Sequence, residues 1–143
     1  MAYLDEKIRG QVSQFLQDLQ DSVTIQIYPG PNPELSQVFL DLSNEVADLS
    51  DLIMVAQIAE APPLEPGHSG TESASGPIAT LLDNQGHPTG IRFVGIPSGH
   101  EFGAFLEGIK AVSTHEAQLS DQAKQALAHI TSPVHIQVFT TPT

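Results

Sequence analysis

The residue types that most often carry out chemistry in proteins are either missing from this sequence or placed without a catalytic pattern. It contains no cysteine, which excludes disulfides, thiolate nucleophiles and thiolate–metal sites. The six histidines form no His-x3-His or His-Glu-x-x-His pattern on a predicted helix; they are His68, His87, His100, His115, His129 and His135. No serine lies in a Gly-x-Ser-x-Gly elbow, and the glycines form no phosphate-binding loop. The sequence therefore predicts no catalytic residue, no metal and no cofactor.

One polar run, Ser98-Gly99-His100-Glu101, has two interpretations. As chemistry, His100 and Glu101 would act together as a base or as metal ligands, but adjacent helical residues point in different directions. As structure, Ser98 and Glu101 have the spacing of a capping box, in which each side chain accepts a hydrogen bond from the other residue's backbone N–H. We favour helix capping.

The charge balance limits the partners. Seventeen acidic residues against five basic ones give a formal net charge of −12. The basic residues are scattered along the chain, so a nucleic-acid surface or an anionic membrane surface is not expected. No apolar run is long enough to span a bilayer, and the N-terminus lacks the features of a secretory signal, so a cytoplasmic location is expected.

The hydrophobic pattern predicts alternating helices and strands. A helix is expected over about Asp5–Gln20, a strand at Val23–Ile27, and a second helix that Asn32 caps and Pro33 begins. Further strands are expected at Leu52–Ile58, Pro77–Leu82, Ile91–Val94 and Val134–Phe139, with two helices between the last two and an exposed loop at Ala61–Gly76.

This order places a βαβ unit before a ββα unit, which is the thioredoxin-like arrangement. The predicted fold is therefore α/β, with a four-stranded mixed sheet, helices on both faces and an extra N-terminal helix. The last helix and strand, about Ser120–Phe139, are surplus to one such unit.

Two segments carry a family resemblance. Ile91-Arg92-Phe93-Val94-Gly95-Ile96-Pro97-Ser98-Gly99-His100-Glu101-Phe102 resembles the strand–turn–helix segment of the first unit of the protein disulfide oxidoreductases, which are glutaredoxin-like proteins with two thioredoxin folds. It also resembles the N-terminal domain of the alkyl hydroperoxide reductase flavoprotein subunit. Val134-His135-Ile136-Gln137-Val138-Phe139-Thr140-Thr141-Pro142-Thr143 is similar to the first strand of the second unit, which leads into a redox Cys-x-x-Cys.

The resemblance implies a degenerate active site. A Cys-x-x-Cys would belong in the loop Tyr28, Pro29, Gly30, Pro31, Asn32 and Pro33, which has no cysteine. It also implies that Pro77 follows a cis peptide bond and faces that loop. Residues 1–118 would form one thioredoxin-like unit, and residues 119–143 would lead into a second unit that is absent.

Two functions follow as expectations. The first is a redox-inactive scaffold or docking module, not itself an enzyme, whose partner is a second thioredoxin-like unit or a redox partner protein. In that case the active Cys-x-x-Cys lies beyond Thr143. The alternative is a free-standing interaction protein of the same fold, with Val134–Phe139 pairing within the domain or joining a second chain to form a homodimer.

Overall fold

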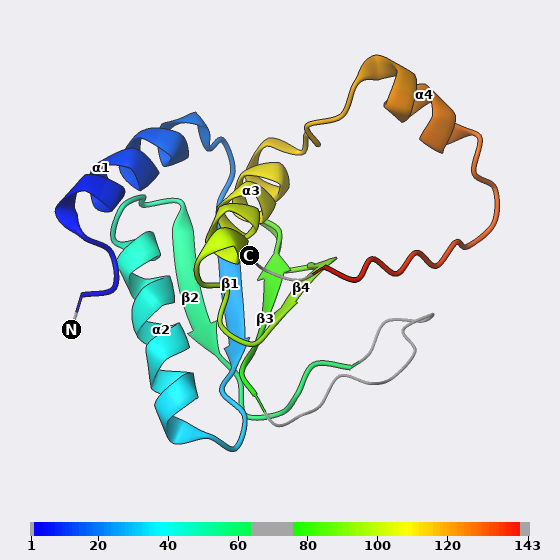
Figure 1. The fold of residues 1–143 in the computed structure, drawn as a ribbon. Coiled ribbons are helices and arrows are strands. Elements are labelled where there is room, and N and C mark those ends of the chain that lie inside the picture. Colours follow the sequence, from blue (N-terminus) through cyan, green and yellow to red (C-terminus); the bar gives the residue numbers. More distant parts are fainter. Residues whose placement is uncertain (1, 64–75, 141–143) are drawn as a thin grey trace.

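The computed structural model describes residues 2–63 and 76–140 of this chain (Figure 1). The elements within these ranges run in the order α1 (Glu6–Phe15), the 3₁₀ helix η1 (Leu16–Asp18), β1 (Val23–Tyr28), α2 (Pro33–Ala47), β2 (Ile53–Gln57), β3 (Ile78–Leu82), β4 (Pro88–Val94), α3 (His100–Thr114) and α4 (Asp121–Ala128).

The four strands form one mixed sheet in the order β2-β1-β3-β4. Strand β1 pairs in parallel with β2 and antiparallel with β3, and β3 pairs antiparallel with β4. The expected βαβ unit followed by a β-hairpin and a helix is therefore confirmed. The helix α2 is the crossover connection that two parallel strands require.

The helices α1 and α2 each begin at a residue whose side chain caps the first turn. The Asp5 carboxylate accepts the N–H of Ile8 at 2.8 Å and starts α1. The Asn32 side chain accepts the N–H groups of Glu34 and Leu35 at 3.1 and 3.2 Å, and Pro33 occupies the first turn of α2. The predicted start of α2 is confirmed.

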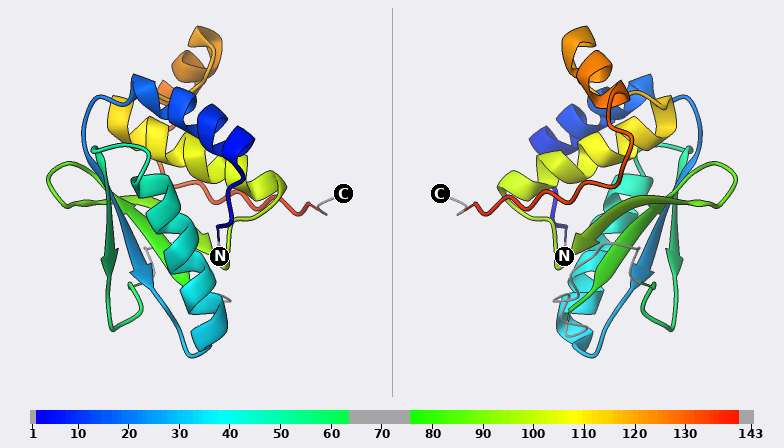
Figure 2. Two further views of the ribbon diagram at one scale, coloured as in Figure 1. Left: turned by 90° about the vertical axis from the view of Figure 1, so that its left-hand side faces the viewer. Right: turned by 90° about the vertical axis from the view of Figure 1, so that its right-hand side faces the viewer.

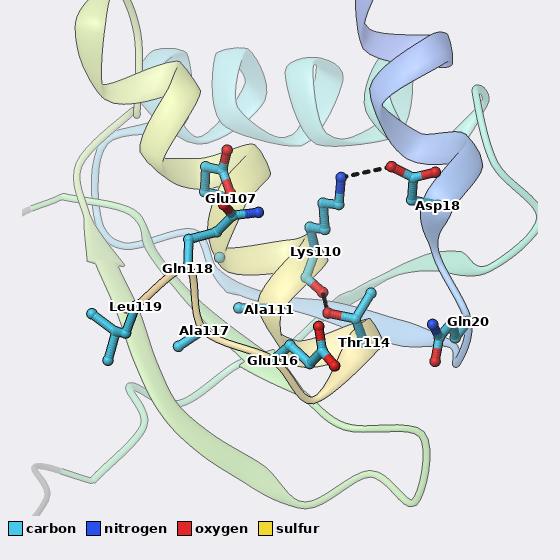
Figure 3. A pocket seen from close by; sticks show the side chains of 11 residues that line it. Asp18, Gln20, Glu107, Lys110, Ala111, Thr114, Glu116, Ala117, Gln118 and Leu119 are labelled. Atoms are coloured by element: carbon cyan, nitrogen blue, oxygen red, sulfur yellow. Dashed lines mark hydrogen bonds and ion pairs between the residues drawn. The ribbon is translucent and has the colours of Figure 1, made fainter. Parts of the chain in front are cut away.

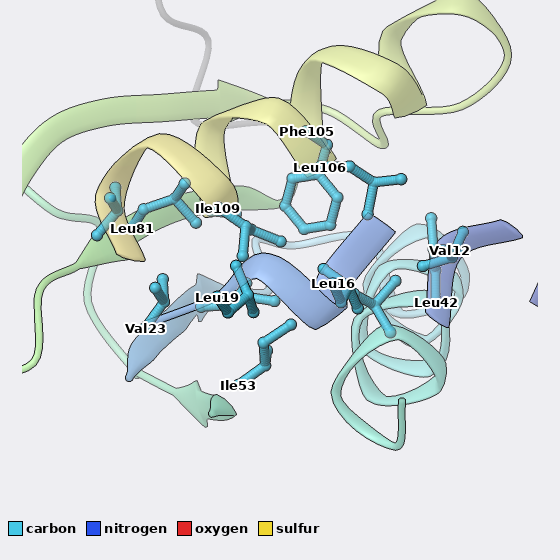
Figure 4. Close-up of a cluster of buried hydrophobic side chains, with 14 of the residues drawn as sticks. Val12, Leu16, Leu19, Val23, Leu42, Ile53, Leu81, Phe105, Leu106 and Ile109 are labelled. Carbon is cyan, nitrogen blue, oxygen red and sulfur yellow. The ribbon is translucent and has the colours of Figure 1, made fainter. Parts of the chain in front are cut away.

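The hydrophobic core lies between one face of the sheet and the helices α1, α2 and α3, which Figure 2 shows on the same side of the strands. Because their apolar side chains meet in a single cluster, these three helices cover one face, whereas the sequence predicted helices on both faces. Alternate residues of β1 point into it, and Val23, Ile25 and Ile27 are fully buried. The ring of Phe105 from α3 lies 6.0 Å from that of Phe39 in α2 and 5.3 Å from that of Phe93 in β4. Figure 4 shows side chains of α1 and η1 completing this cluster.

A buried serine ties the C-terminal end of α3 to the turn before β1. The Ser113 hydroxyl accepts the N–H groups of Gln20 and Asp21 at 2.9 and 3.1 Å and donates to the Asp21 carbonyl oxygen at 2.6 Å. Nearby, the Lys110 ammonium lies 2.8 Å from the Asp18 carboxylate and 4.5 Å from the centre of the Phe15 ring. These contacts fix α1 and η1 against α3.

The C-terminal region differs from expectation in one element. The fourth helix is present as α4, with Ser120 as its N-cap, but none of its residues is buried. The expected strand Val134–Phe139 is not formed: these residues are in no regular secondary structure, and Ile136 and Phe139 are 78% and 90% exposed. A strand requires a neighbouring strand for its backbone hydrogen bonds, and the described sheet contains only β1 to β4.

Within the described residues, no helix is long and apolar enough to cross a membrane.

Candidate functional site

The fold brings the loop Tyr28–Pro33 against the residues that lead into β3. Tyr28, the last residue of β1, pairs with Ile78, the first residue of β3. Two residues later, Gly30 has a φ of +75° and lies so close to Gly76 that a Cβ atom at position 30 would be 2.7 Å from the Gly76 carbonyl oxygen. This contact requires glycine both for its backbone conformation and for the space it leaves. The loop and Pro77 are therefore neighbours, as the resemblance implied.

The polar groups of this loop are used to hold its own shape. The Ser36 hydroxyl lies 2.5 Å from the Pro29 carbonyl oxygen and 2.6 Å from that of Asn32, so it bridges the loop to the first turn of α2. The Asn32 side chain is occupied by capping α2. The loop residues Pro31, Asn32 and Pro33 line an open depression with Glu34. Since the sequence contains no cysteine, this surface offers no thiol nucleophile.

Pro77 differs from expectation in one respect. The structure has no cis peptide bond in residues 2–63 and 76–140, so the Gly76–Pro77 bond is trans. The trans form is the intrinsically favoured one for an X–Pro bond. Pro77 itself is fully buried, and its carbonyl oxygen accepts the N–H of Gly95 at 2.8 Å.

The expected capping box of α3 is also wrong. The N-cap of α3 is Gly99, with a φ of +60°, and the helix begins at His100. The Glu101 N–H donates to the backbone carbonyl of Ser98 at 3.2 Å, and the α3 N-cap has no side-chain hydrogen bond. Because Gly99, with its positive φ, takes the cap position, Ser98 lies one residue too early for its hydroxyl to cap the helix. His100 and Glu101 are both exposed.

A large open cavity lies elsewhere, between η1, α3 and the segment that leads to α4 (Figure 3). It has a volume of about 1030 Å³, and its lining includes the paired Lys110 and Asp18 together with Glu107, Glu116 and Leu119. The sequence analysis did not find it. No local signal exists, because Asp18 and Lys110 are 92 positions apart and meet only in the fold.

No group of three or more potential metal ligands occurs in the described part of the chain. His115 lies 2.7 Å from the Asp21 carboxylate, and His87 lies 3.6 Å from that of Asp83. Each of these two histidines is paired with one carboxylate at the surface. His68 and most of the predicted Ala61–Gly76 loop lie outside the described residues.

Comparison with solved structures gives the fold. The chain superposes on the alkylhydroperoxide reductase protein AhpF of Enterococcus faecalis with a TM-score of 0.73 and 25% identity, covering 91% of this chain and 62% of that one. The N-terminal NTD_N/C domain of the same protein gives 0.69 and 27%, covering 86% and 59%. The chain has a thioredoxin-like fold. This thioredoxin-like unit also matches a protein disulfide oxidoreductase from Aeropyrum pernix in fold, with a TM-score of 0.64 at 21% identity over 90% of this chain and 56% of that one.

Curated relatives of the thioredoxin-like unit are longer proteins. It is 29% identical over 136 residues to an NADH dehydrogenase of Ferdinandcohnia aciditolerans and 26% identical over 136 residues to an NADH dehydrogenase of Bacillus subtilis. Each match covers 95% of this chain but only 23% and 24% of the relative, so the chain spans about a quarter of their length. No family model matches the chain.

Proposed function

We propose that this chain is a redox-inactive thioredoxin-like unit that serves as a scaffold or docking module of a thiol–disulfide oxidoreductase. Its partner is a second thioredoxin-like unit, or a redox partner protein, that carries the Cys-x-x-Cys beyond Thr143, and it works in the cytoplasm. The observation that carries the proposal is the loop Tyr28–Pro33, which follows β1, precedes α2 and contacts Gly76 but contains no cysteine. The loop lies against Gly76, and it lacks the thiols that a redox site of this kind requires.

The relatives support a unit of this kind inside a larger redox protein. The curated relatives are named NADH dehydrogenases and are about four times as long as this chain, and two structural neighbours belong to an alkylhydroperoxide reductase. The rigid core, the closed loop and the exposed apolar residues of the C-terminal region suit a part that positions another unit. Because its surface carries no thiol, the chain would position another unit without exchanging disulfides with it.

The direct test is the coding sequence beyond the codon for Thr143. We expect an open reading frame that continues into a Cys-x-x-Cys shortly after Thr143. A stop codon at that point would contradict the proposal as stated.

A second candidate function rests on the exposed apolar residues of the C-terminal region by themselves. Seven apolar residues from the end of α3 onward are exposed, by 44% to 90%: Leu119, Leu127, Ile130, Val134, Ile136, Val138 and Phe139. Water-exposed apolar side chains in this number indicate an interaction surface. They favour a free-standing interaction protein of thioredoxin-like fold that assembles as a homodimer.

A further inference from the structure

The charge of this chain is divided unevenly along its length. All seventeen acidic residues lie within residues 1–121, whereas residues 122–143 contain Lys124, His129 and His135 and no acidic residue. The C-terminal segment is thus neutral to positive in a chain whose net charge is −12. Its charge complements the rest of the molecule and every other copy of it.

The same segment has the composition of a strand. Val134, Ile136 and Val138 alternate with His135 and Gln137, and the three apolar side chains are 61%, 78% and 78% exposed. β-branched residues at every second position favour a strand with one apolar face. A strand of this kind is stable only when it adds to the edge of a sheet.

The edge of the sheet at β2 fits such a strand. In the described sheet, β2 pairs with β1 alone, and its five residues Ile53–Gln57 include no charge and no proline. The Leu52 carbonyl and the Ile58 N–H bond toward β1, so by alternation the backbone groups of Val55 and Gln57 point away from the sheet. An edge of this composition lacks the devices that proteins use against strand addition.

Acidic side chains flank this edge. Asp48 and Asp51 precede β2, Glu60 follows it, and all three are exposed. They would face a segment that carries histidines and no acidic residue, whereas any acidic strand would be repelled. The other edge, β4, is less suitable, because it begins with Pro88, contains Gly90 at a φ of +82°, and has an irregular register opposite Thr80–Leu82.

The segment and the β2 edge of one chain lie on opposite sides of the molecule. Figure 1 shows the chain after α4 running on the β4 side of the sheet, and two strands separate β4 from β2. To reach its own β2 edge, the segment would have to cross a face of the sheet. The β2 edge of a second copy imposes no such crossing.

We propose that residues Val134–Phe139 of one chain add as a strand to the edge of β2 in a second copy, and that the exchange is reciprocal, giving a closed two-fold dimer. This inference rests on the second candidate function above and names the surface and the segment through which the copies meet. Two strands are added in each dimer, and the apolar side chains of both segments leave the water.

Because the chain contains no cysteine, single introduced cysteines report on this contact without interference. Tagged Met54→Cys, at the β2 edge, is mixed with untagged Ile136→Cys or Gln137→Cys, which sample both faces of the added strand, and oxidised. Val94→Cys in β4 is the matched control, since Val94 and Met54 are 48% and 52% exposed. We expect a disulfide-linked tagged–untagged pair with Met54→Cys and none with Val94→Cys. The reverse result, or no cross-link with Met54→Cys, would overturn the inference.

Light scattering separates this inference from the function on which it rests. The expected mass is twice 15.3 kDa for the unmodified chain. Gln57→Pro removes one outward N–H of the β2 edge and should weaken dimerisation by roughly tenfold or more. Gln57→Ala, which keeps that N–H, should not, and circular dichroism verifies that both variants fold. A dimer insensitive to Gln57→Pro defeats the inference and leaves the homodimer function standing; a monomer defeats both.

Discussion

At the scale of single residues, two buried serines differ in what their hydroxyl groups do. Ser113 is fully buried and makes three hydrogen bonds with Gln20 and Asp21. We expect Ser113→Ala to lower the free energy of unfolding by about 1–3 kcal/mol, because it leaves the Gln20 N–H without its acceptor and the Asp21 carbonyl without its hydroxyl donor; the Asp21 N–H keeps the Ser113 backbone carbonyl as an acceptor. Ser43 in α2 is equally buried, but its hydroxyl has no partner among the described residues. Ser43→Ala is therefore the matched control and should leave stability unchanged or raise it. Equal losses in urea unfolding would contradict this difference.

Gly30 is the residue that allows the loop Tyr28–Pro33 to lie against Gly76. A Cβ atom there would lie 2.7 Å from the Gly76 carbonyl oxygen, and the φ of +75° is unfavourable for other residues. We expect Gly30→Ala to destabilise the fold by about 1–3 kcal/mol. Gly86, with a φ of +81° in the β3–β4 turn, has nothing within 4 Å of the same atom. Gly86→Ala thus carries the conformational cost without the collision, and a loss as large as that of Gly30→Ala would disprove the contact.

One carboxylate gives the fold a dependence on pH. The backbone N–H of His87 donates to Asp83, and this bond is the main cause that lowers the pKa of Asp83 below its ordinary value of 3.8. Desolvation opposes the His87 bond with a smaller effect than that bond has, and the N–H of Gln85 lowers the pKa further. Because the folded-state pKa is the lower one, the contribution of Asp83 to stability is present above pH 3.8 and is lost as the pH falls through the folded-state value.

Asp83→Asn removes this titration while keeping an oxygen acceptor. Chemical unfolding at neutral pH and in acid below pH 3.8 should show that acid destabilises the unmodified chain more than the variant. Equal acid sensitivity would mean that the turn does not contribute to the pH dependence.

At the scale of elements, the helices α2 and α3 begin in different ways. The side chain of Asn32 caps α2, so Asn32→Ala should cost about 1 kcal/mol. Ser98 takes part at the start of α3 through its backbone carbonyl, which accepts the N–H of Glu101, so among the described residues its hydroxyl is not the cap and Ser98→Ala should change stability by less than about 0.5 kcal/mol. Thermal unfolding of both variants compares the two caps, and the reverse order would restore the capping box that the sequence suggested.

The sequence predicts those elements whose signals are local. The stripes of α2 and α3, the alternation of β1 and the turn residues between β3 and β4 each lie within one segment, and all were found. The cap of α3 was missed because Ser98 and Glu101 have the right spacing, while Gly99 takes a conformation with positive φ that spacing does not reveal. Val134–Phe139 has the composition of a strand, but a strand also needs a partner, and composition does not supply one.

At the scale of the molecule, element order was enough to predict a thioredoxin-like fold, and the structural neighbours agree. The position of the loop Tyr28–Pro33 next to Pro77 was predicted through resemblance alone. The peptide bond before Pro77 is trans, and the large cavity between η1 and α3 was unforeseen. The cavity depends on a contact between distant segments, Asp18 with Lys110, which no pattern along the chain encodes.

The central claim is that this thioredoxin-like unit is redox-inactive by itself. Reduction of insulin disulfides by dithiothreitol, followed with and without the chain, tests it most directly. A Pro29→Cys, Asn32→Cys double variant, which places a Cys-x-x-Cys in the degenerate loop, checks that the assay detects a thiol pair at this position. We predict that the unmodified chain leaves the rate of dithiothreitol alone unchanged. Catalytic acceleration by the unmodified chain would contradict the account.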